Sequence, residues 1–532
     1  MWKRTVVVFA VLVSGIVLLS LRLLGVPSLT QAVDLNTGGQ SVVIDRSRGS
    51  ITDCNGLPLV GKDAALFAAA EPSAAAQNVL RSALNNERFE QASERLTKGN
   101  VVSVQVDREL PENDVRMATA YPRYGTSPLA VHLIGYLDGD GKQGLTGLEK
   151  TYNTLLESHA GSLLARLPSN ARGIALGGAD IEILSENYGS KAGIQLTIDR
   201  NIQEITEKAL RNGGIEQGAA IVLDAKTGEI RALASTPAFD PNDIAASLND
   251  PSEPFLNRAL LALPVGSTFK PFIAAAALEQ GILPGTRFTC TGTYTIGDKV
   301  FRCNDEKAHG EVTMPEALAQ SCNIYFIQLG QMLEKQGLLD ILASFGFGAP
   351  LTLADGIASA KGNLPTLQDL RLPGAVANLC FGQGSLLCSP LQLAAATAAL
   401  CNGGMWIEPT LIKGTTDTAG TLSPLQSTPD ARNAVSAETA ELLRIMLKGV
   451  VENGTGKSAK PENNTAGGKT ATAQTGRYDE AGNEILQSGF TGFFPANDPK
   501  YVIVIVKQNG ASGSRECAPV FKAIADAIEQ EE

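Results

Sequence analysis

Ser267 and Lys270 form the only Ser-x-x-Lys of this 532-residue chain. A loop marked by proline and glycine, 263–266, precedes them, and an alanine-rich segment that favours a helix follows at 271–278. Residues three apart on a helix share one face, so the lysine amine can take the proton of the serine hydroxyl if the rest of the chain keeps that amine neutral. The spacing therefore predicts a serine nucleophile with a lysine base.

Two other patterns gain meaning from their order along the chain. Ser-x-Asn occurs three times, at Ser185, Ser247 and Ser321, and Lys-Thr occurs three times, at Lys150, Lys226 and Lys469. Neither pattern is specific by itself. Only Ser321-Cys322-Asn323, in a helical stretch expected over 313–333, and Lys469-Thr470-Ala471 follow the serine. These two triplets predict a polar site shared with Ser267 and Lys270.

Other catalytic interpretations fail on the residues that they require. Two Gly-Lys-Ser/Thr segments lack the first glycine of a phosphate-binding loop, because Val451 and Asn463 stand in its place. The chain holds three histidines and no Gly-x-Ser-x-Gly, so a histidine triad is not indicated, and His309 is expected in a turn. Lys226-Thr227-Gly228 is interpreted as the turn of a hairpin over 218–235.

Composition and charge limit the class of protein. The apolar fraction of 44% and charged fraction of 19% are those of a globular chain, and a net charge of −11 without a basic run argues against nucleic acid as a partner. Lys3 and Arg4 precede an apolar run over 5–21, extended past Arg22 to residue 26, which is long enough to span a bilayer. The positive charges place the N-terminus in the cytoplasm and the rest of the chain outside the cell. A cleaved signal peptide is the alternative, but no convincing cleavage site of the A-x-A type follows the run, so an uncleaved anchor is favoured.

The eight cysteines raise the question of disulfides in an external protein. Cys290 and Cys303 flank a strand-like segment, and pairing them centres a hairpin between Ile296 and Gly297. That geometry is compatible with a disulfide, which would stabilise the fold by about 3 kcal/mol. The other cysteines are expected to be buried small apolar residues. No cysteine has the C-x-x-C spacing of a zinc site, and no metal is expected.

The organisation along the chain predicts two domains. The region 27–192 mixes strand-like pieces, such as 101–106, with helical ones, such as 147–156, and holds no catalytic constellation. In the region 193–532, strand-like segments stand at both ends and helical ones lie between them. This order predicts an α+β fold in which one antiparallel sheet carries a helical insertion.

The ordered set of Ser267-x-x-Lys270, Ser321-x-Asn323 and Lys469-Thr470-Ala471 resembles the penicillin-binding protein transpeptidases. Further segments resemble signatures of class B, the monofunctional members: Arg48-Gly49-Ser50-Ile51-Thr52-Asp53, Leu133-Ile134-Gly135-Tyr136, Gly144-Leu145-Thr146-Gly147-Leu148-Glu149 and Phe381-Gly382-Gln383-Gly384. The resemblance implies a transmembrane anchor at 1–26, a linker and mixed pedestal domain at 27–192, and a transpeptidase domain at 193–532. In that last domain, an antiparallel sheet flanked by helices carries a helical subdomain.

The resemblance also implies roles for the motif residues. Ser267 would attack the D-Ala-D-Ala end of a peptidoglycan stem peptide and become acylated, while Lys270 would take its proton. Ser321 would relay that proton to the leaving D-alanine, and Asn323 would orient Lys270 and the substrate amide. Burial and the neighbouring charge of Lys469 would lower the pKa of Lys270 from its reference of about 10.4.

The third motif and its strand would hold the substrate. Lys469, Thr470 and Thr472 would bind the terminal carboxylate, and the backbone N–H groups of Ser267 and Thr472 would form the oxyanion hole. Ala471 stands where the family usually has glycine, which lets substrate approach the strand. Its methyl group is expected to narrow the site or alter β-lactam sensitivity without abolishing activity.

The function implied is a membrane-anchored serine D,D-transpeptidase that cross-links peptidoglycan outside the cell and binds β-lactams covalently. The cross-link would join an amine of a second stem peptide, without a cofactor, and a separate glycan polymerase would be a partner because no glycosyltransferase domain fits before residue 194. One rival is a D,D-carboxypeptidase, β-lactamase or β-lactam sensor. Another is a scaffold of the cell-wall machinery with a damaged Lys-Thr-x motif. A role in elongation, division or sporulation stays open.

Overall fold

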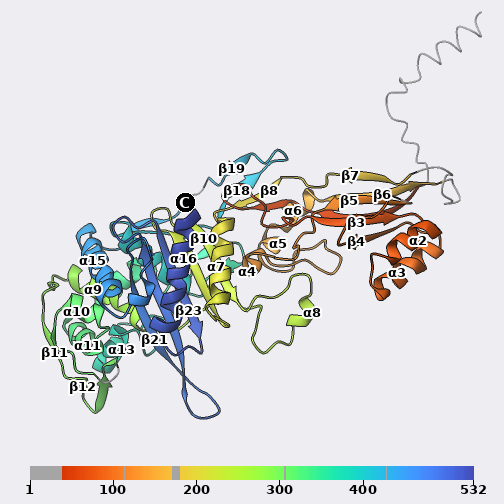
Figure 1. Ribbon diagram of the computed structural model, residues 1–532. Helices are drawn as coiled ribbons and strands as arrows, with labels where there is room; N and C mark the ends of the chain where they lie inside the picture. Colours follow the sequence, from red (N-terminus) through yellow and green to blue (C-terminus); the bar gives the residue numbers. More distant parts are fainter. Residues whose placement is uncertain (1–38, 113, 170–179, 305–306, 427, 532) are drawn as a thin grey trace, which may run out of the picture. The chain divides into compact units, whose positions relative to one another are not determined.

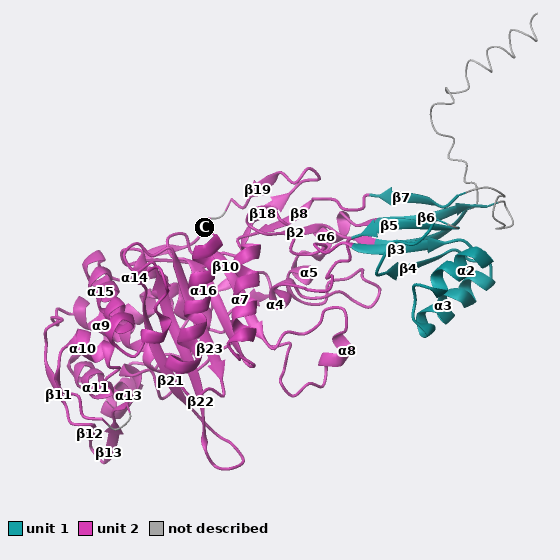
Figure 2. Cartoon of the chain, in the orientation of Figure 1, with its two compact units in different colours: residues 1–45, 65–120, 162–186 teal, residues 46–64, 121–161, 187–532 magenta. Residues whose placement is uncertain are grey.

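The computed structural model describes residues 39–112, 114–169, 180–304, 307–426 and 428–531. The chain divides into two compact units (Figure 2). Unit 1 takes described residues up to 45 together with 65–120 and 162–186, and unit 2 takes 46–64, 121–161 and 187–532. The chain therefore enters each unit more than once. The domain boundary between residues 192 and 193 stays a prediction.

A five-stranded antiparallel sheet is the centre of unit 2 (Figure 1). Its order is β10(Ile230–Thr236), β9(Gly218–Asp224), β23(Tyr501–Gln508), β22(Glu484–Phe494) and β21(Gly467–Tyr478). The central strands are apolar at nearly every position because both faces of the sheet are buried. The hairpin expected over 218–235 is confirmed, and its two strands are connected by residues 225–229.

Helices cover both faces of this sheet. Ile221 and Val504 pack on one face against the large core that includes α9(Lys270–Glu279) and α14(Pro390–Cys401). Val222 and Ile503 point to the other face, where they join the core of α7(Arg200–Asn212) and α16(Ala518–Glu531). The remaining helices of unit 2 are α4(Val131–Ile134), α5(Gly147–Thr151), α6(Asn153–Ser158), α8(Ile244–Ser247), α10(Met314–Ala319), α11(Asn323–Met332), α12(Lys335–Ser344), α13(Pro373–Cys380) and α15(Ala437–Asn453).

The predicted α+β architecture is confirmed for unit 2, since the helices α8 to α15 lie in the sequence between β10 and β21. The single helix expected over 313–333 is wrong. Residues 320–322 separate α10 from α11, and Ser321 has a backbone φ of 56°, which no helix accommodates. The helical piece expected over 147–156 is likewise two short helices, α5 and α6.

Smaller sheets complete unit 2. A four-stranded sheet has the order β19(Leu422–Pro424), β18(Ile412–Thr416), β8(Gly193–Leu196) and β2(Ser50–Thr52). Two-stranded pairs are β11(Phe288–Cys290) with β14(Gly310–Val312), β12(Thr293–Ile296) with β13(Lys299–Arg302), β15(Thr352–Ala354) with β16(Ile357–Ala358), and β17(Met405–Ile407) with β20(Ala431–Asn433). The β12–β13 turn is centred between Gly297 and Asp298, one residue later than expected, because Ile296 pairs with Lys299.

Arg48 and Glu149, from two of the N-terminal signature segments, form a buried ion cluster with Arg123 in unit 2. The Glu149 carboxylate is fully buried and lies 3.5 Å from Arg48 Nε and 2.5 Å from Arg123 Nε. Asp53 accepts backbone hydrogen bonds from Asn55 and Leu57, both of 2.8 Å. Arg48, Asp53 and Glu149 are thus held by structural contacts within unit 2, and the pedestal role of these segments stays a prediction.

Unit 1 is small and contains two three-stranded sheets. In one, β3(Ala65–Ala70) lies between β4(Val102–Val106) and β5(Val115–Ala120), and a core beneath it includes residues of α2(Ala74–Arg81) and α3(Asn86–Thr97). Both helices begin with a capped end, since the side chains of Ser73 and Asn85 each accept a backbone N–H. The other sheet has the order β1(Gly39–Ser47), β6(Gly161–Pro168) and β7(Glu182–Glu186).

Within the part of the chain that the structure describes, no helix is long and apolar enough to cross a membrane. The anchor predicted at 1–26 lies outside the described residues.

Candidate active site

Ser267 lies in a 3-10 turn, η1(Gly266–Phe269), that leads directly into α9. Its side chain is half-buried, whereas Thr268, Phe269 and Lys270 are buried. The turn depends on Gly266, which has a φ of 55° and donates a 3.0 Å hydrogen bond to the carbonyl of Gly382. The serine is thus partly exposed, while the buried residues that follow it fix the turn in the core.

Gly382 explains the signature at 381–384. Its φ is 78°, and a Cβ there would lie 1.9 Å from the Gly266 carbonyl oxygen, so only glycine permits this contact. The segment therefore supports the turn that carries Ser267. The sequence resemblance identified this segment without indicating what it contacts.

Lys270 joins the first motif to the second. Its side chain is fully buried, and its Nζ donates to the Ser321 carbonyl at 2.7 Å, to Ser321 Oγ at 3.3 Å and to Asn323 Oδ1 at 2.7 Å. The same nitrogen lies 5.7 Å from the centre of the Phe326 ring. The amine is therefore fixed in position beside the Ser-x-Asn triplet, as the motif order predicted.

Ser321 reaches Lys270 because the chain is not helical at that point. Its φ of 56° reverses the chain between α10 and α11, a conformation that costs a non-glycine residue free energy. The Sγ of Cys322 then accepts the Tyr325 backbone N–H and begins α11. Asn323 is held from its other side, because Nδ2 donates to the Arg302 carbonyl at 3.2 Å.

Lys469 lies on β21, the last strand in the order of the five-stranded sheet, and is 1% exposed. Its Nζ donates to the Thr470 carbonyl at 3.1 Å. Burial lowers the pKa of Lys469 well below its ordinary value, and the charge of Lys270 lowers that pKa further. Two charged amines in one buried site are therefore unfavourable.

Burial also lowers the pKa of Lys270 to about 8, while Cys322 and Cys303 oppose the shift. The sequence predicted burial together with the charge of Lys469 as the causes. Burial is the first cause for both lysines, and the repulsion between the two amines makes it unfavourable for both to be charged. A pKa near 8 leaves roughly a tenth of Lys270 neutral at pH 7, so this amine can act as a base without a large rearrangement.

The strand after Lys469 lies against the nucleophile turn. A Cβ on Gly266 would be 3.1 Å from Ala473 Cβ and 3.4 Å from the Thr472 carbonyl oxygen, so η1 and β21 are in close contact. Thr470 Oγ1 is hydrogen-bonded to Thr455 Oγ1 at 2.8 Å, whereas Thr472 is exposed and its Oγ1 accepts the Gly513 N–H at 3.4 Å. The two backbone segments predicted to form the oxyanion hole are neighbours.

Ala471 is 4% exposed and pairs across the sheet with Gly489. A Cβ on Gly489 would lie 3.8 Å from the Ala471 methyl, an ordinary van der Waals distance. The Ala471 methyl group is therefore buried and packs over Gly489, which has no side chain. Whether it narrows the substrate site stays a prediction.

The predicted disulfide is absent: Cys290 and Cys303 are free thiols in the structure. The reason is that β12 and β13 pair without either cysteine, and Cys290 pairs with Gly310 in β11 and β14. Both sulfurs instead contact Nδ1 of His309, at 3.5 Å and 3.4 Å. Sequence spacing gave no signal for this contact.

A cavity of about 550 Å³ lies elsewhere in unit 2, lined by Arg48, Tyr121, Lys191 and Thr416 among others. It shares no residue with the site built from the three motifs. Its volume is therefore no guide to the catalytic centre.

Comparisons with known proteins agree with this geometry. The family described as "Penicillin binding protein transpeptidase domain" matches residues 218–526, more than half of the chain. Stage V sporulation protein D of Bacillus subtilis is 30% identical over 502 residues, which cover 88% of this chain and 75% of that protein. Penicillin-binding protein PbpB of Mycolicibacterium smegmatis is 32% identical over 438 residues, which cover 76% of this chain and 64% of that protein.

Among solved structures, penicillin-binding protein 3 of Mycobacterium tuberculosis complexed with aztreonam superposes with a TM-score of 0.65 at 26% identity. The match covers 92% of this chain and 97% of that chain. The chain therefore belongs to the penicillin-binding protein transpeptidases. Within them it is a class B member, a peptidoglycan D,D-transpeptidase, and the resemblance stated from its motifs is confirmed.

Proposed function

We propose that this protein cross-links peptidoglycan stem peptides through an acyl-enzyme on Ser267, with Lys270 as the base, and that β-lactams acylate the same oxygen. The observation that carries the proposal is the position of the buried Lys270 amine. Lys270 lies one helical turn after the half-buried Ser267, and its amine contacts Ser321 and Asn323. Burial keeps its pKa low enough for a base.

In the first step Ser267 Oγ attacks the carbonyl carbon of the penultimate D-alanine, and its proton passes to the neutral amine of Lys270. The backbone N–H groups of Ser267 and Thr472 stabilise the oxyanion of the tetrahedral intermediate. The peptide C–N bond then breaks, and the leaving D-alanine amine takes the proton from Lys270 by way of the Ser321 hydroxyl. This leaves an ester on Ser267.

In the second step an amine of another stem peptide attacks the ester carbonyl. The new amide bond forms, the C–O bond to Ser267 breaks, and the amine's proton returns to the serine oxygen through Lys270. Lys469, Thr470, Ala471 and Thr472 line the donor's position along β21, where the buried amine of Lys469 becomes a counter-charge when it takes up a proton beside a bound terminal carboxylate.

The first test is covalent labelling with a fluorescent penicillin, followed by peptide mass spectrometry of the full-length protein. The wild type should carry one adduct on Ser267, and Ser267→Ala should carry none. Ser185→Ala is a matched control, because that exposed serine begins another Ser-x-Asn on β7, and its labelling should equal the wild type. An adduct on a different residue would overturn the assignment.

The second test separates cross-linking from hydrolysis. Lipid-linked precursor is polymerised by a separate glycan polymerase in the presence of wild type or Ser267→Ala, and the muropeptides are analysed. Cross-linked dimers with the wild type alone support a transpeptidase. Release of D-alanine without dimers would assign this chain to the carboxypeptidases, and adduct formation without either product would indicate a scaffold.

The proposed location rests on the sequence before the described residues. We propose that the apolar run at 5–26 anchors the protein, with the catalytic residues outside the cell and a polymerase as partner. Protease treatment of intact spheroplasts should digest the catalytic region, while alkaline washing should leave the protein in the membrane fraction. Release of the full chain by that washing would contradict the anchor.

A further inference from the structure

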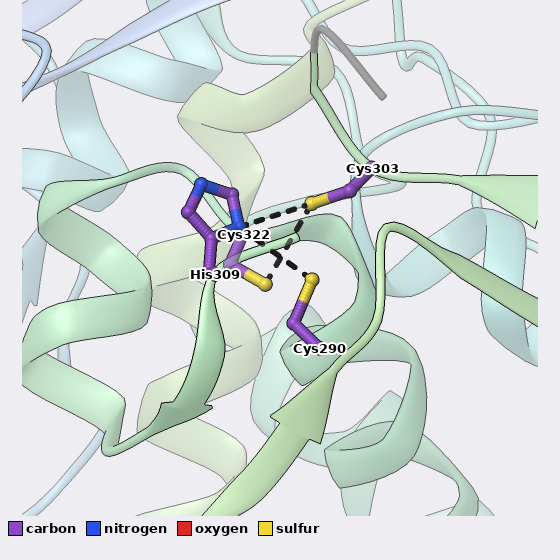
Figure 3. Close-up of side chains that lie close together, drawn as sticks. All are labelled: Cys290, Cys303, His309 and Cys322. Atoms are coloured by element: carbon purple, nitrogen blue, oxygen red, sulfur yellow. Dashed lines mark hydrogen bonds between the residues drawn. The ribbon is translucent and has the colours of Figure 1, made fainter. Parts of the chain in front are cut away.

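Three cysteines and one histidine converge beside the proposed active site (Figure 3). Cys290 ends β11, His309 precedes β14, Cys303 follows β13, and Cys322 lies in the turn before α11. Their ligand atoms all lie within 4.8 Å of one another. The three cysteines are buried and the histidine is half-buried, so four donors from four places in the sequence share one small volume.

Three of the distances between the ligand atoms match a single tetrahedral ion. Sulfur at about 2.3 Å and nitrogen at about 2.0 Å from a common tetrahedral centre place two sulfurs about 3.8 Å apart and a sulfur and a nitrogen about 3.5 Å apart. The distance between the sulfurs of Cys303 and Cys322 is 3.7 Å. His309 Nδ1 lies 3.5 Å from the Cys290 sulfur and 3.4 Å from the Cys303 sulfur.

Other interpretations of the cluster account for less of it. A disulfide requires a sulfur–sulfur distance of about 2.05 Å and would use two thiols, leaving the third and the imidazole without a function. Apolar packing explains a buried cysteine beside aliphatic residues, but it does not explain why two thiols contact one imidazole nitrogen and a third thiol contacts one of them. A ligand set of three sulfurs and one nitrogen is typical of structural zinc.

The cluster is connected to the catalytic residues by the chain itself. Cys322 stands between Ser321 and Asn323, the two residues that hold Lys270. Cys303 follows Arg302, whose carbonyl accepts the Asn323 side-chain amide. An ion bound to these ligands would fasten the turn at 320–322 to the β11–β14 pair and so hold Ser321 in its left-handed conformation.

We propose that Cys290, Cys303, His309 and Cys322 bind one zinc-class divalent ion that positions the Ser321–Asn323 turn. The metal site stands on its own geometry, and its effect on acylation rests on the proposed function. The sequence prediction of no metal depended on the absence of C-x-x-C, and that criterion misses ligands spread over 33 positions of the chain, from 290 to 322. The four ligands act as positioning residues and touch no substrate.

The first experiment measures metal in the full-length protein purified under reducing conditions without chelator. Elemental analysis should give one zinc per chain, and replacement by cobalt(II) should give the intense visible and thiolate charge-transfer bands of a tetrahedral sulfur-rich site. Cys290→Ser and His309→Ala should each weaken zinc binding roughly tenfold or more. Cys401→Ala is the matched control and should keep the full zinc content, because that cysteine lies apart from the cluster, at the end of α14.

The second experiment asks whether the ion positions the catalytic turn. His309→Ala and chelator-treated wild type should both be acylated by fluorescent penicillin more slowly, roughly tenfold, with adducts still on Ser267. His309→Cys keeps a four-ligand thiolate site and should restore both zinc and the acylation rate. A general loss of folding would not be repaired by that substitution.

The outcomes separate the two proposals. A protein without zinc or cobalt bands, or one with a Cys290–Cys303 disulfide, overturns the metal site whether or not Ser267 is acylated. A protein with one zinc and no adduct on Ser267 retains the metal site and overturns the proposed function. Zinc whose removal leaves acylation unchanged overturns the positioning role.

Discussion

Two Lys-Thr pairs lie at opposite sides of the same five-stranded sheet, and their surroundings differ completely. Lys226 lies in the turn between β9 and β10, where its side chain is 57% exposed and forms a 2.8 Å ion pair with Asp498. Lys469 lies on β21, is 1% exposed, and has a pKa lowered by burial and by Lys270. The same Lys-Thr dipeptide thus has a solvent-exposed lysine in the turn and a buried lysine on the strand.

The comparison teaches that burial, and not the dipeptide, makes such a lysine useful. An exposed ammonium keeps its proton and its hydration, and its surface ion pair contributes little. A buried amine beside a second amine loses its hydration and has a lowered pKa. It can therefore accept a proton from a reacting group or pair with a bound carboxylate. The same contrast holds for Ser321, which contacts Lys270, and Ser185, which is exposed on β7.

The largest expected effect is at the lysines themselves. Lys469→Ala should lower the rate of β-lactam acylation by about 10²- to 10³-fold, because it removes the buried amine that takes up a proton beside a bound carboxylate. Lys226→Ala should leave the rate unchanged, since it removes only a surface ion pair. Stopped-flow acylation with a fluorescent penicillin measures both. If both variants lost acylation rate equally, the conclusion that burial distinguishes the two lysines would be wrong.

The Ser-x-Asn copies provide the next contrast. Ser321→Ala should slow acylation by about 10- to 100-fold, because Lys270 loses a hydrogen-bond partner and the proton relay. Ser321→Gly should lose a similar amount of activity while unfolding at a higher temperature than Ser321→Ala, since glycine accepts a φ of 56° without strain. Ser185→Ala should match the wild type in both measurements. If the alanine variant melted above the glycine variant, the strain assigned to this turn would be wrong.

The pH dependence should show the lowered pKa of Lys270. The base works in its neutral form, so the acylation rate should rise with pH, reach half of its limit at about 8 and level off above that value. Below the midpoint the rate should fall about tenfold per pH unit. Lys226→Ala should keep the same profile. A flat profile between pH 6 and 9, as an approximate range, would contradict Lys270 as the base.

The smallest expected effect comes from exchanging the third residues of the two triplets. Ala471→Gly should change acylation by less than about threefold and destabilise the fold by about 0.5–1 kcal/mol, because the buried methyl contacts the Gly489 position and glycine weakens a strand. Gly228→Ala should destabilise by about 1–2 kcal/mol, since Gly228 has a φ of 73° and a Cβ would lie 3.1 Å from Ile407 Cγ2. Chemical denaturation measures both. A large gain of acylation in Ala471→Gly would show that the methyl narrows the substrate site.

Much of the fold was predictable because it depends on local pattern. The apolar strands at 218–224 and 501–508 and the capped helix α14 are encoded by contiguous residues, and the order of strands and helices restricts their arrangement. The helix expected over 313–333 failed because its sequence has good helical propensity on both sides of Ser321. Nothing local indicates that the chain reverses there to bring Ser321 to Lys270.

The cysteines show the opposite limit. Their spacing favoured a disulfide bond between Cys290 and Cys303. Neither the spacing nor the number of cysteines indicated that His309 and Cys322 lie beside them. Only the register of β11 with β14 and the turn before α11 bring the four ligands together. Contacts of this kind depend on distances across the fold, which sequence separation does not predict.

By itself the sequence determined the Ser267–Lys270 pair, the order of the three motifs and hence the family, because these depend on residue type and position. Tertiary structure alone decided that Lys270 and Lys469 are buried, that Ser321 adopts a left-handed conformation, and that a histidine joins three cysteines beside them. The physical reason is that a pKa and a ligand geometry are set by what surrounds a group in space. Here those surroundings come from segments as far apart in the sequence as Gly266 and Thr472.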